Sequence, residues 1–265
     1  MSESWDVTRV RSFVALGDSF TEGLNDPYPD GGGDAYRGWA DRVAQRLAGV
    51  NPDLEYANLA VRGKLLRQIV TGQVPQACAL KPDLVSFCGG GNDVLRPSGD
   101  PDELARIFEA GVRRLRESGA QVLVFTGFDT RQVPVLRRLR GRIATYNMNL
   151  RAIADRHDCL LVDQWAMHAL EDWRAWGEDR LHLSSEGHRR MALRVCEVLG
   201  VPVDGDWREP WPAERPEDWL SRRRKDVQWA RDFMAPWVNR RLHGRSSGDG
   251  RVAKHSALGP VERDG

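Results

Sequence analysis

A serine, an aspartate and a histidine stand in this sequence where they could act together on a carbonyl group. Ser19 lies between Gly17 and Gly23, directly after a short apolar run. Asp179 precedes His182 by three positions, so its carboxylate can hold one imidazole nitrogen and leave the other free to accept a proton. Each residue alone also suits a structural role, since serine and aspartate are common in turns and helix caps. Together they predict a nucleophile with its base.

Two further segments carry groups that could stabilise a negatively charged oxygen. Gly63 follows a second apolar run, and a glycine there lets backbone approach a bound ligand closely. Asn92 follows the glycine run 89–91, and its side-chain amide could donate hydrogen bonds to an oxyanion. In isolation the glycine could serve a strand-to-helix turn and the asparagine could cap the next helix.

Short apolar runs alternate with segments of helical period, which predicts an α/β fold with a five-stranded, mostly parallel sheet. Ligands of such sheets bind at the carboxyl ends of the strands, where the candidate residues lie. The expected strands are Ser12–Leu16, Leu54–Leu59, Leu84–Cys88, Gln121–Thr126 and Cys159–Val162. The expected helices are Gly38–Leu47, Leu65–Ala79, Asp102–Glu117, Ile143–Arg156 and Glu186–Leu199.

The composition changes after Gly200, and we divide the chain there. We expect residues 1–200 to form the domain with the candidate residues, residues 201–243 a Trp-rich helical extension packed on it, and residues 244–265 a disordered tail. Within the extension Pro216–Met234 has helical periodicity. Aromatic side chains bury large areas, so the tryptophans must cover the domain or, alternatively, a partner or membrane surface. They are Trp207, Trp211, Trp219, Trp229 and Trp237.

The overall composition excludes several classes of protein. The chain has 265 residues, 41% of them hydrophobic, which is enough for a sizeable core. Its 39 basic residues nearly cancel 38 acidic ones, so a dedicated nucleic-acid binder is not expected. The sequence shows no signal peptide and no membrane-spanning run, which favours the cytoplasm. The four cysteines have neither metal-site nor disulfide-scaffold spacing, and we expect free thiols.

The candidate segments, in their order along the chain, resemble the blocks of the SGNH, or GDSL-type, hydrolase superfamily over roughly residues 12–200. Four blocks in order are a specific signal, although no single block would be. Phe20 stands where the family name has leucine, an apolar change that puts little in doubt. The matching blocks are Gly17-Asp18-Ser19, Gly63, Gly90-Gly91-Asn92-Asp93 and Asp179-Arg180-Leu181-His182.

The resemblance implies a flavodoxin-like three-layer α/β/α sandwich and hydrolysis of carboxylic esters or thioesters through an acyl-serine. Ser19 would be the nucleophile, His182 the general base and then acid, and Asp179 the group that orients the imidazole. The oxyanion would be bound by the backbone N–H groups of Ser19 and Gly63 and by the Asn92 side chain. No metal or organic cofactor is implied. Short acyl chains are expected, because the chain lacks a long apolar lid.

Other titratable residues near these blocks are assigned structural roles. Asp18 and Asp93 are expected to hold loops through hydrogen bonds. His188 has no carboxylate three positions before it and stands where a helix begins, so we expect it to be structural. An arginine cluster follows the fourth strand, and it either forms a solvated helix start or contacts an anionic acyl donor. Its members are Arg131, Arg137, Arg138, Arg140 and Arg142.

Two alternatives to hydrolysis stay open at this point. An acyltransferase would use the same acyl-serine and pass the acyl group to an alcohol. A non-catalytic binding module would act through the Trp-rich extension, but such a module has no need of all the candidate site residues. The oligomeric state is not indicated by the sequence.

Overall fold

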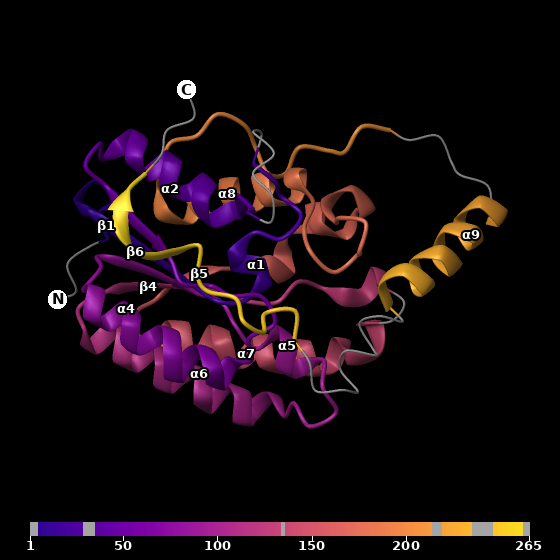
Figure 1. Ribbon diagram of the computed structural model, residues 1–265, viewed down its shortest axis with the longest axis horizontal. Helices are drawn as coiled ribbons and strands as arrows, with labels where there is room; N and C mark the ends of the chain where they lie inside the picture. Colours follow the sequence, from indigo (N-terminus) through magenta and orange to yellow (C-terminus); the bar gives the residue numbers. More distant parts are fainter. Residues whose placement is uncertain (1–4, 29–34, 134–135, 214–218, 235–245, 262–265) are drawn as a thin grey trace.

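In the computed structural model, which describes residues 5–28, 35–133, 136–213, 219–234 and 246–261, six strands form one central sheet (Figure 1). The strand order is β5-β4-β3-β1-β2-β6. The first five strands are parallel, and β6 runs antiparallel to β2. The strands are β1 (Ser12–Leu16), β2 (Glu55–Asn58), β3 (Leu84–Phe87), β4 (Gln121–Phe125), β5 (Leu160–Val162) and β6 (His255–Pro260).

The five strands expected from the sequence are confirmed, but the expectation of a disordered tail is wrong for residues 246–261. These residues contain β6, which makes the sheet six-stranded rather than five-stranded. The segment consists of small and polar residues, and it is ordered by its contacts with the rest of the domain. Its backbone pairs with the free edge of β2, and Lys254 anchors it to the domain.

Helices cover both faces of the sheet, which confirms the three-layer α/β/α architecture (Figure 1). The five long helices are close to the expected ranges, except that the second is interrupted by a π-helical turn at Ile69–Gln73. One face carries α2 (Gly38–Val50) and α8 (Ser185–Leu199). The other carries α3 (Leu66–Gln68), α4 (Val74–Leu80), α6 (Pro101–Glu117) and α7 (Arg140–Arg156).

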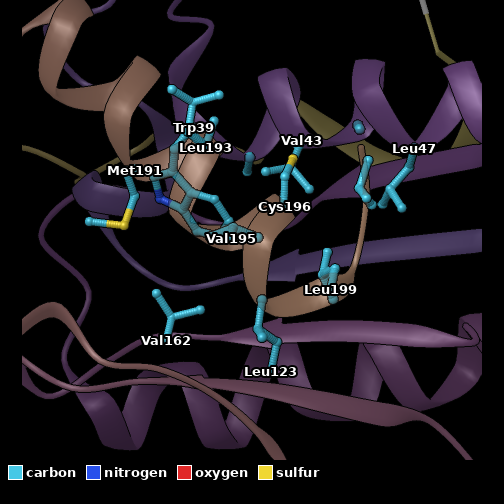
Figure 2. Close-up of a cluster of buried hydrophobic side chains, with 14 of the residues drawn as sticks. Trp39, Val43, Leu47, Leu123, Val162, Met191, Leu193, Val195, Cys196 and Leu199 are labelled. Carbon is cyan, nitrogen blue, oxygen red and sulfur yellow. The ribbon is translucent and has the colours of Figure 1, made fainter. Parts of the chain in front are cut away.

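Two hydrophobic clusters fill the layers on either side of the sheet. In Figure 2, Trp39 and Val43 of α2 meet Met191 and Cys196 of α8 above the strands. The second cluster lies under α4, α6 and α7 and includes the stacked rings of Phe87 and Phe108. Burial on both faces explains why the strands are continuous apolar runs rather than alternating ones.

Two short helices begin at the carboxyl ends of the strands. They are α1 (Ser19–Glu22), after β1, and α5 (Gly91–Val94), after β3. Because β1 and β3 are parallel neighbours, both helices start at the same edge of the sheet. This edge is where the candidate residues were expected to gather.

The Trp-rich extension contacts the domain through individual side chains. Trp207 is buried, and its indole donates a hydrogen bond to Glu197 of α8 at 2.6 Å. Trp211 donates to the Ala169 carbonyl at 3.0 Å. The predicted helix is present as α9 (Trp219–Trp229), followed by a π-helical turn to Met234. Trp237 and the side chain of Trp219 lie outside what the structure describes, so packing of the whole extension stays a prediction.

None of the helices in the described part of the chain is long and apolar enough to span a bilayer.

Candidate active site

Ser19 is presented by the tight connection between β1 and α1. Asp18 is the N-cap of α1, and its carboxylate accepts a hydrogen bond from the Phe20 N–H at 3.1 Å. Gly23 ends the helix in the left-handed region, with φ of 98°. The short helix is therefore capped at both ends, which fixes the Ser19 hydroxyl at the carboxyl edge of the sheet.

His182 and Asp179 come from the loop before α8 and meet Ser19 at this edge. His182 Nε2 lies 2.8 Å from Ser19 Oγ, and His182 Nδ1 lies 2.6 Å from Asp179 Oδ2. The other Asp179 oxygen accepts the backbone N–H groups of Leu181 and His182 at 3.0 Å each. An aspartate that accepts from Nδ1–H leaves Nε2 as the acceptor for the serine proton. The structure thus joins the three predicted residues in one hydrogen-bonded chain.

The charge of Asp179 is stabilised by this arrangement. Burial alone would raise its pKa, but the hydrogen bond and the charge of His182, together with the two backbone N–H groups, lower the pKa to about 2. The carboxylate is therefore ionised at any pH near neutrality. An ionised Asp179 keeps a proton on Nδ1 of His182 and can stabilise the imidazolium that forms when Nε2 takes a second proton.

Gly63 and Asn92, the two further residues expected at the oxyanion site, line the same cavity as Ser19. Gly63 has φ of 73°, a conformation that favours glycine. The residue before it, Arg62, is bound to Glu22 of α1 through its backbone N–H at 2.6 Å and its Nε at 2.8 Å. This pair ties the Gly63 loop to the helix that carries Ser19.

The Asn92 amide is held by two acceptors. Its Nδ2 donates to Asp18 Oδ2 at 3.1 Å and to the Lys64 carbonyl at 3.2 Å. A substrate oxyanion must therefore share or displace one of these bonds. Burial raises the pKa of Asp18 to about 6 against the opposing hydrogen bond from Phe20. Asp18 thus holds both the nucleophile helix and the Asn92 side chain, which confirms its structural role.

The two remaining structural assignments are also confirmed. Asp93 accepts the Leu66 backbone N–H at 2.9 Å and so ties α5 to α3. His188 is 1% exposed, with Nδ1 accepting from the Trp39 N–H and Nε2 donating to the Leu24 carbonyl. Burial lowers the pKa of His188 to about 4, so it is neutral and fully bonded.

The arginine cluster is engaged mainly in contacts within the protein. Arg131 pairs with Glu171, Arg140 pairs with Asp129 at 2.7 Å, and Arg142 donates to the Arg96 carbonyl at 2.9 Å. Among the described residues that line the active-site cavity, none is a member of this cluster. The geometry therefore favours a solvated helix start over contact with an anionic acyl donor.

A cavity of about 420 Å³ joins the candidate residues. All five expected site residues line it, and most of its remaining wall is apolar. The apolar lining comes from β4, α7 and the surrounding loops, and it includes Phe125, Phe128, Ile143, Leu150, Leu170, Trp176 and Leu181.

Three lining residues from the C-terminal part of the chain were missed by sequence reasoning. Phe233 follows α9, and Ser246 and Ser247 precede β6. Phe233 lies within the segment of helical periodicity, but nothing in that periodicity directs its side chain to the cavity. Ser246 and Ser247 stand in a small, polar run that carries no structural signal in the sequence.

Comparisons with known proteins bear on the family and the fold. The model of the GDSL-like lipase/acylhydrolase family matches residues 15–190. A search of curated proteins finds no match. Among solved structures, an alpha/beta hydrolase enzyme, LAE5, from the metagenome of Lake Arreo, Spain, has a TM-score of 0.60 at 23% identity. That match covers 74% of this chain and 99% of the other.

Two further solved structures have the same fold. TesA aligns with a TM-score of 0.59 and 24% identity over 71% of this chain and 97% of its own. Axe2, an acetylxylan esterase from Geobacillus stearothermophilus, aligns with a TM-score of 0.57 and 23% identity over 74% and 95%. These proteins are nearly covered in full, whereas about a quarter of the present chain has no counterpart in them.

Proposed function

The chain belongs to the GDSL-like lipase/acylhydrolase family, and on that basis we propose that it hydrolyses carboxylic esters or thioesters through an acyl intermediate on Ser19. Membership makes it an ester-hydrolysing enzyme. The observation that carries the acyl-serine route is the continuous chain from Ser19 Oγ through His182 to Asp179, with links of 2.8 and 2.6 Å. Both links are within the distances that proton transfer and imidazole orientation need.

In this proposal Ser19 Oγ attacks the substrate carbonyl carbon while His182 Nε2 takes the hydroxyl proton. The tetrahedral intermediate collapses when the bond to the alcohol or thiol breaks, and His182 returns the proton to that leaving group. Water then attacks the acyl-serine, again losing a proton to His182, and the carboxylic acid departs as Ser19 recovers its proton. Asp179 holds the imidazole orientation throughout.

The negative charge of each tetrahedral intermediate would be met by three donors. They are the Ser19 N–H at the start of α1, the Gly63 N–H and the Asn92 side chain. All three residues line the cavity that holds the Ser19 hydroxyl. Loss of one such donor typically costs about 10²- to 10³-fold in rate.

The solved structures of Axe2 support these roles. Variants of that esterase with a serine, a histidine or an aspartate replaced are described as catalytic mutants, and the aspartate precedes the histidine by three positions. Asp179 and His182 have the same spacing here. At this level of identity the likeness supports the proposal and does not by itself assign the residues.

The size and lining of the cavity bear on the length of the acyl chain. Its volume of about 420 Å³ falls in the range of roughly 300–1,000 Å³ typical of pockets for drug-sized ligands. Its lining is mostly apolar, and burial of each methylene group contributes about 0.8 kcal/mol. We therefore propose that acyl chains of medium length bind better than acetyl groups.

The test is a panel of p-nitrophenyl esters and acyl-CoA thioesters of graded chain length, run on wild type and Ser19→Ala. We expect wild-type activity to rise with chain length up to a limit set by the cavity, and Ser19→Ala to be inactive but folded. A fluorophosphonate should label wild type once, at Ser19. Labelling at another serine, or activity in Ser19→Ala, would refute the acyl-serine assignment.

The same panel separates the alternatives. Products formed only when an alcohol acceptor is added would identify an acyltransferase. A wild-type protein that neither hydrolyses any ester nor reacts with the fluorophosphonate would indicate a non-catalytic module.

A further inference from the structure

The segment from Ser246 to Val261 returns to the domain from outside the residues that match the family model. Its strand β6 pairs with β2 in register Tyr56↔Gly259 and Asn58↔His255. β2 leads into the loop that carries Gly63. The C-terminal segment is therefore attached directly to the part of the sheet that presents an expected oxyanion donor.

Lys254 anchors this segment beside the nucleophile helix. Its Nζ donates to the carbonyls of Glu22, Tyr36 and Arg37 at 2.9, 2.7 and 2.8 Å, and to Asp41 Oδ2 at 2.8 Å. The side chain is only 14% exposed. A buried ammonium is tolerated only when its donors are satisfied, so this set of partners fixes the chain position tightly. Glu22 is the last residue of the helix that begins with Ser19.

From this anchor the preceding turn reaches back over the Gly63 loop. A Cβ atom on Gly63 would collide with Ser246 Oγ, and one on Gly248 would collide with the Arg62 carbonyl. Ser246 itself is fixed within the turn, because its N–H donates to Asp249 at 2.8 Å and its Oγ accepts from the Gly248 N–H at 3.2 Å. Two backbone segments thus pack against each other with no room for a side chain on either glycine.

We propose that Ser246 is a positioning residue for the oxyanion site, held against Gly63 by the Lys254 anchor. The inference rests on the proposed function. Oxyanion donors accelerate a reaction because they are held in place before charge develops. The Gly63 loop is held on one side by the Arg62–Glu22 pair and on the other by Ser246. Ser246 and Ser247 also line the cavity, so the same turn forms part of the substrate-binding wall.

The test compares Ser246→Ala and Lys254→Met with a matched control, Ser256→Ala, which alters an exposed serine of the same segment on β6. Loss of the Ser246 contact should lower kcat about 3- to 10-fold with little change in KM, because the oxyanion forms only in the transition state. Lys254→Met should lower kcat further, up to about 10²-fold, by releasing the whole turn. The rate of fluorophosphonate labelling at Ser19 should fall in the same order, and Ser256→Ala should match wild type.

Several outcomes decide the inference. Folded Ser246→Ala enzyme with wild-type kcat would overturn it, and so would a change confined to KM. If Lys254→Met does not fold by circular dichroism, Ser246→Ala still decides. An active, labelled wild type with an unaffected Ser246→Ala variant refutes this inference alone. A wild type without activity or labelling refutes the proposed function and this inference together.

Discussion

Residues 12–200 and residues 201–261 are held in the molecule by different kinds of contact. In the first region whole elements pack, and β1 is buried along its entire length between two helix layers. In the described part of the second region β6 pairs with β2, and single side chains hold much of the rest. Trp207 is buried and Trp211 is partly buried, and each donates one indole hydrogen bond to the domain. Lys254 Nζ has four acceptors within hydrogen-bond distance.

Arginines strengthen these single-residue contacts. Arg190 lies 4.1 Å from the Trp211 ring centroid, and Arg208 lies 4.2 Å from that of Trp207. Each indole therefore has a cation over its ring and an acceptor for its N–H group. The comparison teaches that periodic packing builds the catalytic framework, whereas isolated amphipathic residues attach a further segment that reaches the active site.

If the two regions differ in this way, the catalytic residues should lie within residues 12–200. We expect His182→Ala to lower kcat/KM by at least about 10⁴-fold while leaving the thermal unfolding transition nearly unchanged, because the imidazole sits in a loop. The matched control is His168→Ala, whose side chain is 83% exposed and pairs with Glu171. Steady-state hydrolysis of a p-nitrophenyl ester measures both. Comparable activity in the two variants would show that His182 is not the general base.

Removing an anchor of the second region should affect stability rather than chemistry. Trp207→Ala is expected to lower the free energy of unfolding by about 3–5 kcal/mol, because the ring is only 8% exposed. Met148→Ala serves as control, since Met148 is 67% exposed on α7 and should cost less than about 0.5 kcal/mol. Urea unfolding measures both. A stable, active fragment of residues 1–200 would show that the anchors do not support the domain.

In the first region, His188 is also a single buried side chain that joins separate segments through hydrogen bonds. Burial lowers the pKa of His188 from 6.5 to about 4. Between these pH values the unfolded chain binds a proton at His188 and the folded chain does not. The stability that neutral His188 contributes is complete above pH 6.5 and is lost as the pH falls through 4, by roughly 3 kcal/mol in total. Asparagine does not titrate.

The free-energy gap between wild type and His188→Asn should therefore shrink by that amount from pH 7 to pH 4, as measured by urea unfolding. Taking the difference between the two proteins cancels Asp18, whose raised pKa acts in the opposite direction over the same range. A gap that does not change with pH would mean that His188 is accessible to protons in the folded protein.

The smallest expected effect tests whether the extension touches the catalytic loop. Trp229 donates its indole N–H to the Asp179 carbonyl at 2.9 Å, and its ring lies 5.3 Å from Arg180, which has φ of 55°. Trp229→Phe keeps an aromatic side chain and removes the hydrogen bond, so kcat/KM should fall only about 3- to 10-fold. Trp165→Phe, a ring stacked on Arg140 outside the cavity lining, is the control. Equal kcat/KM values for the two variants would show that α9 does not influence the site.

The division between the regions also explains what could be predicted from the sequence. The five parallel strands and the helices around them follow from apolar periodicity, and the site residues follow from the order of four short blocks. The π-helical turn at Ile69–Gln73 was not predicted, because one extra residue in a helix hardly disturbs the pattern. β6 was missed because His255–Pro260 has no apolar alternation. The segment is held by Lys254, and the residues that Lys254 contacts lie more than 200 positions away in the sequence.

β6 also changes what the sheet presents at its outer edge. Without it β2 would end the sheet, and its mostly buried residues would expose a row of unpaired backbone groups. Such edges act as templates for pairing with other chains, and proteins block them with proline and irregular strands. β6 carries Pro260, which has no N–H to donate, and its register against β2 shifts between Tyr56 and Asn58. The strand that follows the Ser246 turn and Lys254 therefore also protects the fold against edge-to-edge aggregation.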